Sequence, residues 1–327
     1  MVSRRAFMAG VLSGACISPI AYSQQARKVP RIGVLWHAAN IEEETPYFQS
    51  LIEGFRVLGY VEGRNIAFEH RFPNEVPELF ARMATELVSS KPDVLVGAGA
   101  AASYLKKATA TIPIIFVYVP DPVGADLVES VRRPGGNATG MTNFGVLLSA
   151  KRLEIFKETV PSVTRVGLLV NPNVKISSLY IQESMQAGLK LGIAIQAFEA
   201  RALSDFEPAF DAMVKARMQG VVVNAESLFF QGKHVIAKLA LARNLPTCVY
   251  VRELLEAGGL VSYGVDQRAI ARRVAVYVER VLKGEKPSEM PVEQPTRFEL
   301  IVNTKTAKAL GVKIPQMILG RADDVVH

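Results

Sequence analysis

Hydrophobic and polar residues alternate along the chain in two distinct ways from Arg31 onward. Short runs rich in β-branched residues are each followed by a longer segment whose apolar residues recur at helical spacing. This order predicts α/β architecture, a parallel sheet covered by helices on both faces. The predicted strands cover 31–36, 66–71, 94–97, 114–119, 165–170, 193–201, 220–224 and 247–251. The predicted helices cover 48–58, 77–89, 101–108, 176–191, 206–217, 233–243 and 267–282.

The same order of elements occurs twice in the sequence. The run RIGVL that starts at Arg31 is matched by RVGLL from Arg165, and FEHR from Phe68 is matched by FEAR from Phe198. A repeat of this length is too long for a solenoid unit and predicts two similar three-layer, Rossmann-like lobes. The length agrees, because 327 residues exceed the ~250–300 at which a single core usually stops growing.

Three segments are suited to carry the chain between the lobes. Gly-rich segments at 135–143 and 258–264 end the two copies of the pattern, and a Pro-punctuated segment at 287–295 follows the last predicted helix. We expect three crossover strands that together form a hinge. The predicted domains are 29–142 plus 265–292 for the first lobe and 143–264 plus 293–327 for the second.

The first 23 residues have the features of an export signal. Arg4 and Arg5 precede an apolar stretch, and small residues ending at Ser23 provide a cleavage site. We interpret 1–23 as a twin-arginine signal peptide and expect a periplasmic protein cleaved near Ser23. A lipid anchor on Cys16 is the alternative, although the large aliphatic residue expected three places before such a cysteine is missing. No later stretch is long and apolar enough to span a bilayer.

Charge and cysteine content narrow the function classes. The formal net charge of +7 includes the two signal arginines, and the remaining basic residues are interleaved with acidic ones. Without a basic stripe alternating with aromatic residues, we expect no nucleic-acid binding. A transcription regulator with a two-lobed body would also need a helix-turn-helix in front, where the export signal lies. Cys248 lies in an apolar run, so we expect it to be a small, buried hydrophobic residue. Cys16 is removed with the signal, so Cys248 has no partner for an intramolecular disulfide.

Ligands of open α/β sheets bind beyond the carboxyl ends of the strands, and this rule nominates candidate residues. The small residues of the loop after strand 94–97 let backbone N–H groups approach a carboxylate, helped by the helix dipole. Acidic candidates could take an ammonium group, an arginine could take an anionic end, and Trp36, Tyr118 or Tyr250 could stack on an apolar ring. The full ligand-binding set is His37, Gly99, Ala100, Ala101, Tyr118, Asp121, Asn143, Asn171, Glu226, Arg252 and Asp266.

Purely structural roles are open for several of these candidates. Asp121 lies between two prolines, and capping a turn could be its whole role. Asn171 precedes a proline, as turn residues often do, and Arg252 could pair with Glu253. His37 follows a predicted strand, and it could be an ordinary, partly exposed loop histidine that does not contact the ligand.

An enzyme is the alternative interpretation of the same loop. The spacing Gly97-x-Gly99-x-x-Ala102 follows a predicted strand and opens a helix, with Asp121 downstream, as in a dinucleotide-binding fingerprint. It predicts an exported cofactor-binding oxidoreductase. The 4 histidines are scattered without metal-ligand spacing, so we expect no metal site and no catalytic residues in the preferred interpretation.

Four strings resemble those of a known family. They are LGYVEGRNI at 58–66, DPVG at 121–124, RPGGNATG at 133–140 and PVEQPTRFEL at 291–300. Together they resemble the ABC transporter substrate-binding proteins with the type I periplasmic-binding fold, a group that includes tryptophan- and phenylalanine-binding members. The resemblance implies a cofactor-free, non-catalytic monomer that captures a small organic ligand, such as an amino acid, by hinge closure and delivers it to a membrane permease.

The sequence departs from this family in one loop. Many relatives carry Ser, Thr or Pro in the segment that reads GAGAAAS at 97–103 here. Backbone amides and Ser103 remain, so a ligand carboxylate would have fewer side-chain partners than in those relatives.

Overall fold

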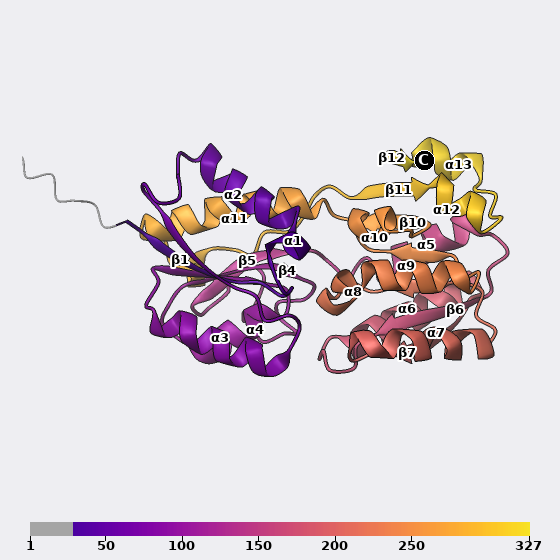
Figure 1. The fold of residues 1–327 in the computed structure, drawn as a ribbon, viewed down its shortest axis with the longest axis horizontal. Coiled ribbons are helices and arrows are strands. Elements are labelled where there is room, and N and C mark those ends of the chain that lie inside the picture. Colours follow the sequence, from indigo (N-terminus) through magenta and orange to yellow (C-terminus); the bar gives the residue numbers. More distant parts are fainter. Residues whose placement is uncertain (1–28) are drawn as a thin grey trace, which may run out of the picture.

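Two β-sheets organise residues 29–327, the part of the chain that the computed structural model describes. Each sheet forms its own lobe, and the lobes lie side by side along the long axis (Figure 1). The structure confirms the predicted fold of two mostly parallel α/β lobes. The predicted signal peptide at 1–23 and Cys16 lie outside the described residues.

The first lobe contains a five-stranded parallel sheet with the order β2-β1-β3-β4-β5. Its central strands are buried along their full length, which matches their continuous apolar sequences, because helices cover both faces (Figure 1). The strands are β1 (Arg31–Leu35), β2 (Ala67–Arg71), β3 (Val94–Ala98), β4 (Ile114–Val119) and β5 (Ala138–Thr142). The helices are α1 (Ile41–Glu44), α2 (Tyr47–Val57), α3 (Pro77–Ser89), α4 (Ala101–Ala108) and the later α11 (Gln267–Leu282), which packs on α2.

The second lobe contains a seven-stranded sheet with the order β12-β11-β10-β9-β8-β6-β7. The pair β10–β11 is antiparallel and the other pairs are parallel. The strands are β6 (Arg165–Val170), β7 (Ala194–Glu199), β8 (Val221–Val223), β9 (Thr247–Val249), β10 (Val261–Gly264), β11 (Glu299–Asn303) and β12 (Asp324–Val326).

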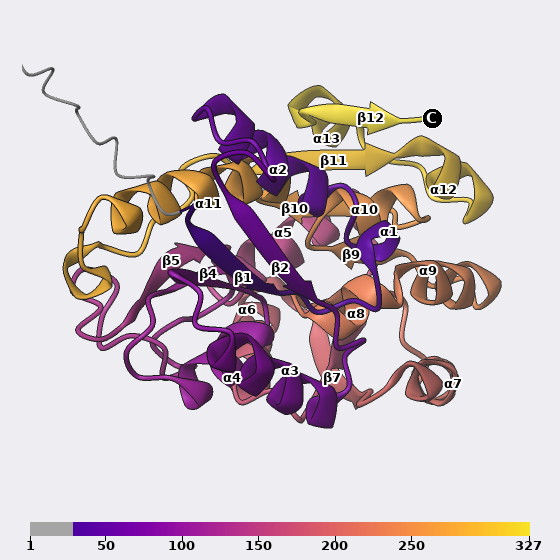
Figure 2. The ribbon, with the colours of Figure 1, turned by 60° about the vertical axis from the view of Figure 1, so that its left-hand side comes forward.

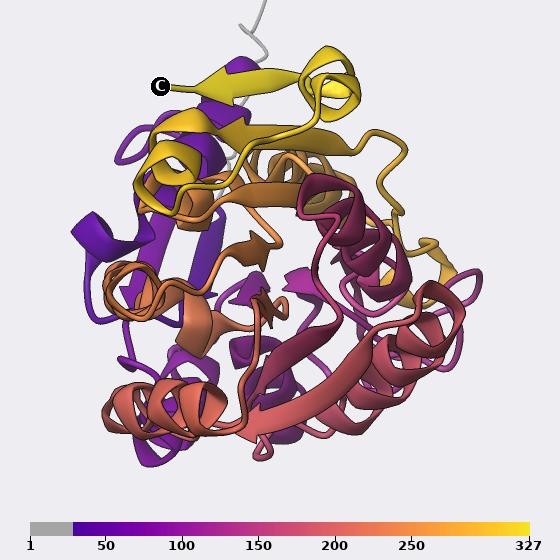
Figure 3. The same cartoon turned by 90° about the vertical axis from the view of Figure 1, so that its right-hand side faces the viewer.

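Helices also cover both faces of the second sheet, as the view onto this lobe shows (Figure 3). Helices α5 (Ser149–Thr159) and α6 (Ser177–Leu191) lie on one face, and α7 (Phe206–Lys215) and α9 (Lys233–Ala242) lie on the other. Short elements complete the lobes, namely α8 (Ser227–Gln231), α10 (Arg252–Glu256), α12 (Thr304–Ala309), α13 (Gln316–Arg321) and the 3₁₀ turns η1 (Leu203–Asp205) and η2 (Pro287–Glu289).

The chain passes between the lobes at three places, after β5, after β10 and before β11. Backbone hydrogen bonds join the first and third passages, from Glu293 N to Gly140 O (2.9 Å) and from Thr142 N to Glu293 O (3.1 Å). Arg152, only 1% exposed, donates to the carbonyl oxygens of Gly145 (2.9 Å) and Tyr263 (2.8 Å), which ties the first passage to the second. The domain boundaries given above stay a prediction.

Most predicted elements agree with the structure within a few residues, and helix 77–89 agrees in both bounds. The predicted strand 193–201 is shorter, and the structure adds α8, whose first turn Glu226 caps through Leu228 N (2.8 Å). The C-terminal strands β11 and β12 extend the second sheet at its edge (Figure 2). Cys248 is fully buried in the core, as expected. Within 29–327, no helix combines the length and the apolarity needed to cross a membrane.

Candidate ligand-binding site

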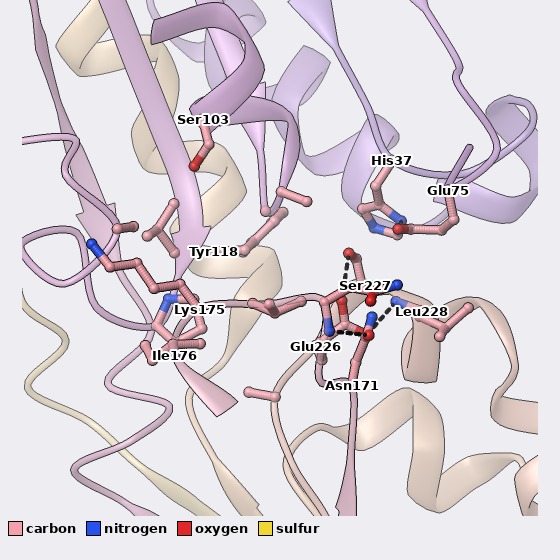
Figure 4. Close-up of a pocket in the computed structure, with 18 of the residues that line it drawn as sticks. His37, Glu75, Ser103, Tyr118, Asn171, Lys175, Ile176, Glu226, Ser227 and Leu228 are labelled. Carbon is pink, nitrogen blue, oxygen red and sulfur yellow. Dashed lines mark hydrogen bonds and ion pairs between the residues drawn. The ribbon is translucent and has the colours of Figure 1, made fainter. Parts of the chain in front are cut away.

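A cavity of about 470 Å³ lies between the lobes, at the carboxyl ends of both sheets. Its volume falls within the range of small-molecule sites. Side chains from both lobes line it: Figure 4 shows His37 and Glu75 of the first lobe facing Glu226 and Asn171 of the second. A ligand in this cavity would contact both lobes at once.

The loop after β3 brings backbone close to the cavity. Gly99 has φ +56, and its N–H donates to the carbonyl of Val117 (2.9 Å). A Cβ at Gly97 would lie 2.7 Å from the Cα of Ala102, so glycine is required where the strand turns into α4. A Cβ at Gly99 would lie 3.7 Å from Cβ of Ser227, which shows that this serine of the second lobe lies opposite the loop.

His37 is held by carboxylates on both sides of its ring. Its Nδ1 lies 3.2 Å from Glu75 Oε1, and its Nε2 lies 3.6 Å from Glu44 Oε2. Burial alone would lower the pKa of His37, but the nearby carboxylates of Glu44, Glu75 and Glu226 outweigh it and raise this pKa to about 9. The imidazole is therefore charged at neutral pH. Glu44 also accepts the backbone N–H groups of His37 and Ala38, at 3.0 Å each, which fixes the loop after β1.

Glu75 is presented by an unusual backbone. Asn74 and Glu75 have φ values of 53° and 55°, in the left-handed region that non-glycine residues seldom adopt. Their N–H groups donate to the carbonyls of Ala38 (3.0 Å) and His37 (2.9 Å), so the turn is fixed against the loop after β1. This arrangement directs the Glu75 carboxylate toward His37 and the cavity (Figure 4).

Glu226 approaches the same region from the second lobe. One of its oxygens accepts the N–H of Leu228 (2.8 Å), and Ser227 Oγ lies 3.4 Å from the other. Burial between the lobes, followed by repulsion from Glu75, raises the pKa of Glu226 to about 8. The carboxyl group is therefore largely protonated at neutral pH when no other cation is beside it.

Aromatic rings form much of the remaining wall. Tyr47 of the first lobe packs on Phe230 of the second and on Tyr118, with centroid distances of 5.1 Å in both pairs. The hydroxyl of Tyr118 donates to Gln267 O (3.2 Å), and that of Tyr250 donates to Glu226 O (3.0 Å). Burial raises the pKa of these tyrosines, so they are neutral and offer apolar faces for a ring-bearing ligand.

Most of the candidates named from the sequence line the cavity. They are His37, Gly99, Ala100, Tyr118, Asp121, Asn143, Asn171 and Glu226. Asp121 also caps its own turn, accepting from Val123 N (3.1 Å) and Gly124 N (2.9 Å). Asn143 Nδ2 donates to Tyr118 O (3.3 Å), so it fixes the strand end.

Three candidates are not among the lining residues. Ala101, the first residue of α4, is fully buried, and Arg252 pairs with Asp324 at 2.6 Å, not with Glu253. Asp266 caps α11 by accepting from Ala269 N (3.1 Å). Trp36 is also absent from the wall, because its indole is buried in the first lobe and donates to His70 Nδ1 (3.1 Å).

Several lining residues were not among the candidates, including Tyr47, Glu75 and Phe230. Glu75 follows β2, so the carboxyl-end rule could have found it. Tyr47 and Phe230 belong to helices, and only the packing of one lobe on the other brings them to the site. In residues 29–327 no group of three or more His, Cys, Asp or Glu side chains is arranged to hold a metal ion.

Two α/β lobes that enclose a cavity at the carboxyl ends of their sheets define the class of two-lobed solute-binding proteins. The family described as ABC transporter substrate binding protein matches residues 43–326, and the chain belongs to this family. Its members bind small ligands and work with ABC permeases. The predicted family is thus confirmed, as is the prediction that the protein is not an enzyme; the oxidoreductase alternative is wrong.

Three individual proteins illustrate the similarity of this chain to known ones. The chain is 26% identical over 276 residues to a tyrosine-binding protein of Clostridioides difficile (strain R20291), covering 81% of this chain and 76% of that protein. A crystal structure of a conserved domain protein from Vibrio cholerae has a TM-score of 0.86 and 27% identity, covering 91% of this chain and 100% of the other. A Streptococcus pneumoniae ABC domain in complex with L-Trp has a TM-score of 0.85 and 24% identity, covering 91% and 99%.

A further solved structure shares the two-lobed fold. A ligand-free, open substrate-binding protein from Clostridium difficile covers the same 91% of this chain, at 22% identity, with a TM-score of only 0.66.

Proposed function

We propose that the protein is the exported solute-binding component of an ABC importer, and that it captures an amino acid or a closely related amine by closing its lobes. The observation that carries this proposal is the cavity of about 470 Å³, which combines an aromatic wall with carboxylates from both lobes. A ligand can favour the closed form only by binding it better than the open form, which requires contacts from both sides.

Contacts across the mouth of the cleft support closure as the capture step. Lys175 Nζ of the second lobe pairs with Asp126 Oδ2 of the first at 2.7 Å. Deeper in the interface, Tyr47 Oη donates to Glu253 Oε2 (2.7 Å). Opening the lobes would separate both pairs, so they belong to the closed state.

The polar groups suggest how such a ligand lies. Its ammonium group would lie between Glu75 and Glu226, and its apolar part would pack on Tyr118 and Tyr250. A carboxylate would approach the backbone of the loop at Gly99, near the Ser227 hydroxyl. The tyrosine-binding and L-Trp-bound relatives support an aromatic amino acid as the first candidate.

The cellular setting follows the same proposal. We infer that 1–23 direct twin-arginine export, that cleavage near Ser23 releases a periplasmic monomer, and that no nucleic acid is bound. The lobes are proposed to comprise 29–142 plus 265–292 and 143–264 plus 293–327. N-terminal sequencing of the exported protein tests the cleavage site, and an uncleaved N-terminus or a lipid on Cys16 would contradict it.

A thermal-shift screen of the mature protein tests the ligand class. The screen contains the amino acids, aromatic amines, sugars and nicotinamide cofactors. A ligand at 100 times its Kd stabilises the native state by about 2.7 kcal/mol, which raises the melting temperature measurably. We expect aromatic amino acids or amines to give the largest shifts. Shifts only with sugars or cofactors would refute the proposed ligand class.

A further inference from the structure

Two carboxylates of opposite lobes share one cavity wall. Glu75 reaches it from the turn after β2 in the first lobe, and Glu226 from the start of α8 in the second (Figure 4). Both residues are partly buried, the side chain of Glu75 being 11% exposed, and repulsion by Glu75 contributes to the raised pKa of Glu226. Closing the lobes therefore costs free energy, because it either brings two like charges together where water screens them less than in bulk or requires Glu226 to take up a proton above its usual pKa.

The surrounding groups do not neutralise this pair. His37 supplies one positive charge, but Glu44 lies on the other side of its ring, 3.6 Å away. Glu44, Glu75 and Glu226 thus surround the His37 imidazolium, and Lys233, over the ring of Phe230, is a second cation that interacts with Glu44. The Oε1 of Glu75, the Oε2 of Glu44 and the Nδ1 of His37 are buried without a hydrogen-bond partner of good geometry. Tyr104, Tyr118, Tyr250 and Asp121 also line the cavity, and Tyr180 lies near Glu226. Four basic residues line it as well, and each has another partner. Lys106 donates to Asn137 Oδ1 (2.8 Å), Lys175 pairs with Asp126 (2.7 Å), Arg201 pairs with Glu199 (2.6 Å), and Lys107 lies over the ring of Tyr104.

The turn that carries Glu75 also contacts the other lobe. Asn74 Oδ1 accepts a hydrogen bond of 2.5 Å from Gln231 Nε2 at the end of α8, the helix that Glu226 caps. The left-handed backbone at Asn74 and Glu75 costs free energy, and such strain persists where surrounding contacts demand it. One strained turn therefore makes a contact that favours closure and presents a charge that opposes it.

We propose that Glu75 and Glu226 form an electrostatic interlock, which lets the lobes close stably only when one positive charge lies between the two carboxylates. In the transport cycle the ligand's cationic group supplies this charge, a role that rests on the proposed function. The interlock selects ligands with an ammonium or similar cation over isosteric ligands without one. A proton on the pair can take the place of the cation, so acidic conditions close the empty protein.

Small-angle X-ray scattering of the ligand-free, mature protein tests the interlock without any ligand. The wild type is expected to be more compact at about pH 6 than at about pH 9, because Glu226 loses its proton near pH 8. Glu226→Gln and Glu75→Gln each remove one of the two charges, and both variants should stay compact at the higher pH. Glu78→Gln is the matched control, because Glu78 is exposed in the first turn of α3 and does not line the cavity; it should behave as the wild type.

The interlock would be overturned if the radius of gyration of the wild type were the same at both pH values and equal to that of both glutamine variants. Circular dichroism shows whether each variant is folded, and two variants of opposite lobes make a common folding defect easy to recognise.

A second arm uses three probes that share a 4-hydroxyphenylethyl framework: L-tyrosine, tyramine, which lacks the carboxylate, and 3-(4-hydroxyphenyl)propanoate, which lacks the ammonium group. The interlock predicts that calorimetry detects binding of the two amines, and that Glu75→Gln weakens it about tenfold or more, the usual effect of losing a charged hydrogen bond. The same substitution should leave binding of the propanoate unchanged or strengthen it. Tighter wild-type binding of the propanoate than of both amines would overturn the interlock. If none of the three binds, the proposed ligand class fails, while the scattering result still decides the interlock.

Discussion

Glu253 offers a direct measure of how much the lobe interface contributes to closure. This residue of α10 is only 8% exposed and accepts hydrogen bonds from two groups of the other lobe. Tyr47 Oη donates to Oε2 at 2.7 Å, and the guanidinium of Arg268 reaches Oε1 through Nε at 3.0 Å and Nη2 at 2.9 Å. Glu253 does not line the cavity, so a change there acts on closure and not on ligand contacts.

Glu253→Gln keeps the shape of the side chain and removes its charge. Charge-assisted hydrogen bonds are worth about 1 kcal/mol more than neutral ones, and the Arg268 side chain is 39% exposed, so solvent screens part of the effect. The closed state should lose about 1–2 kcal/mol relative to the open state. Only the closed form binds the ligand fully, so the apparent affinity falls in proportion to the fraction of the protein that is closed. The Kd should therefore rise about 5- to 30-fold.

Calorimetric titration with an aromatic amine from the screen measures this change. Glu256→Gln is the control on the same helix, because Glu256 is exposed and its carboxylate lies 4.0 Å from Arg268; its Kd should stay within about twofold of the wild type. An unchanged Kd in Glu253→Gln would show that the contacts of Glu253 are equally strong in the open state, and the reasoning would fail.

Three further changes test other parts of the structure. Arg152→Leu leaves the carbonyls of Gly145 and Tyr263 without donors, so urea denaturation should show a loss of about 2–5 kcal/mol. His37, with its pKa raised to about 9, stabilises the folded state fully below pH 6.5 and loses this contribution as pH rises through 9. The free energy of unfolding should fall by about 3 kcal/mol over this window, and His37→Gln should flatten the fall; an equal slope in both proteins would contradict the role of the cluster. Cys248 is fully buried, and burial raises its pKa to about 12, so a thiol reagent should label it only after denaturation.

The sequence predicts the lobes and part of the site, because both depend on where the strands end. Hydrophobic periodicity fixes where strands end, and parallel strands place all their carboxyl ends at one edge of a sheet, so Gly99, Tyr118 and Glu226 were found at the cavity. Arg252 also follows a strand, but its partner Asp324 belongs to β12, a strand that the pattern did not reveal.

Side-chain direction is the part that sequence pattern cannot supply. Asp266 precedes a helix and is used to cap it, as acidic residues at such positions often are. Glu75 points into the cavity because Asn74 and Glu75 adopt left-handed backbone, a conformation that no residue type in this turn announces. Tyr47 and Phe230 meet only because two separate lobes close on each other, a contact that depends on tertiary structure alone.

The interface contains contacts that favour closure and, in the proposed interlock, an acidic pair that opposes it. Lys175 contacts Asp126 at the mouth of the cleft, and Tyr47 contacts Glu253 deeper in the interface, with or without a ligand. If these contacts acted alone, the empty protein would close and a ligand could not enter. The interlock opposes them, because Glu75 and Glu226 raise the free energy of the empty closed form, either by charge repulsion or by the proton that Glu226 must take up. Weakening the contacts of Lys175 or Tyr47 and neutralising Glu75 or Glu226 must therefore shift closure in opposite directions, and a protein without this opposition would show the same sign for both.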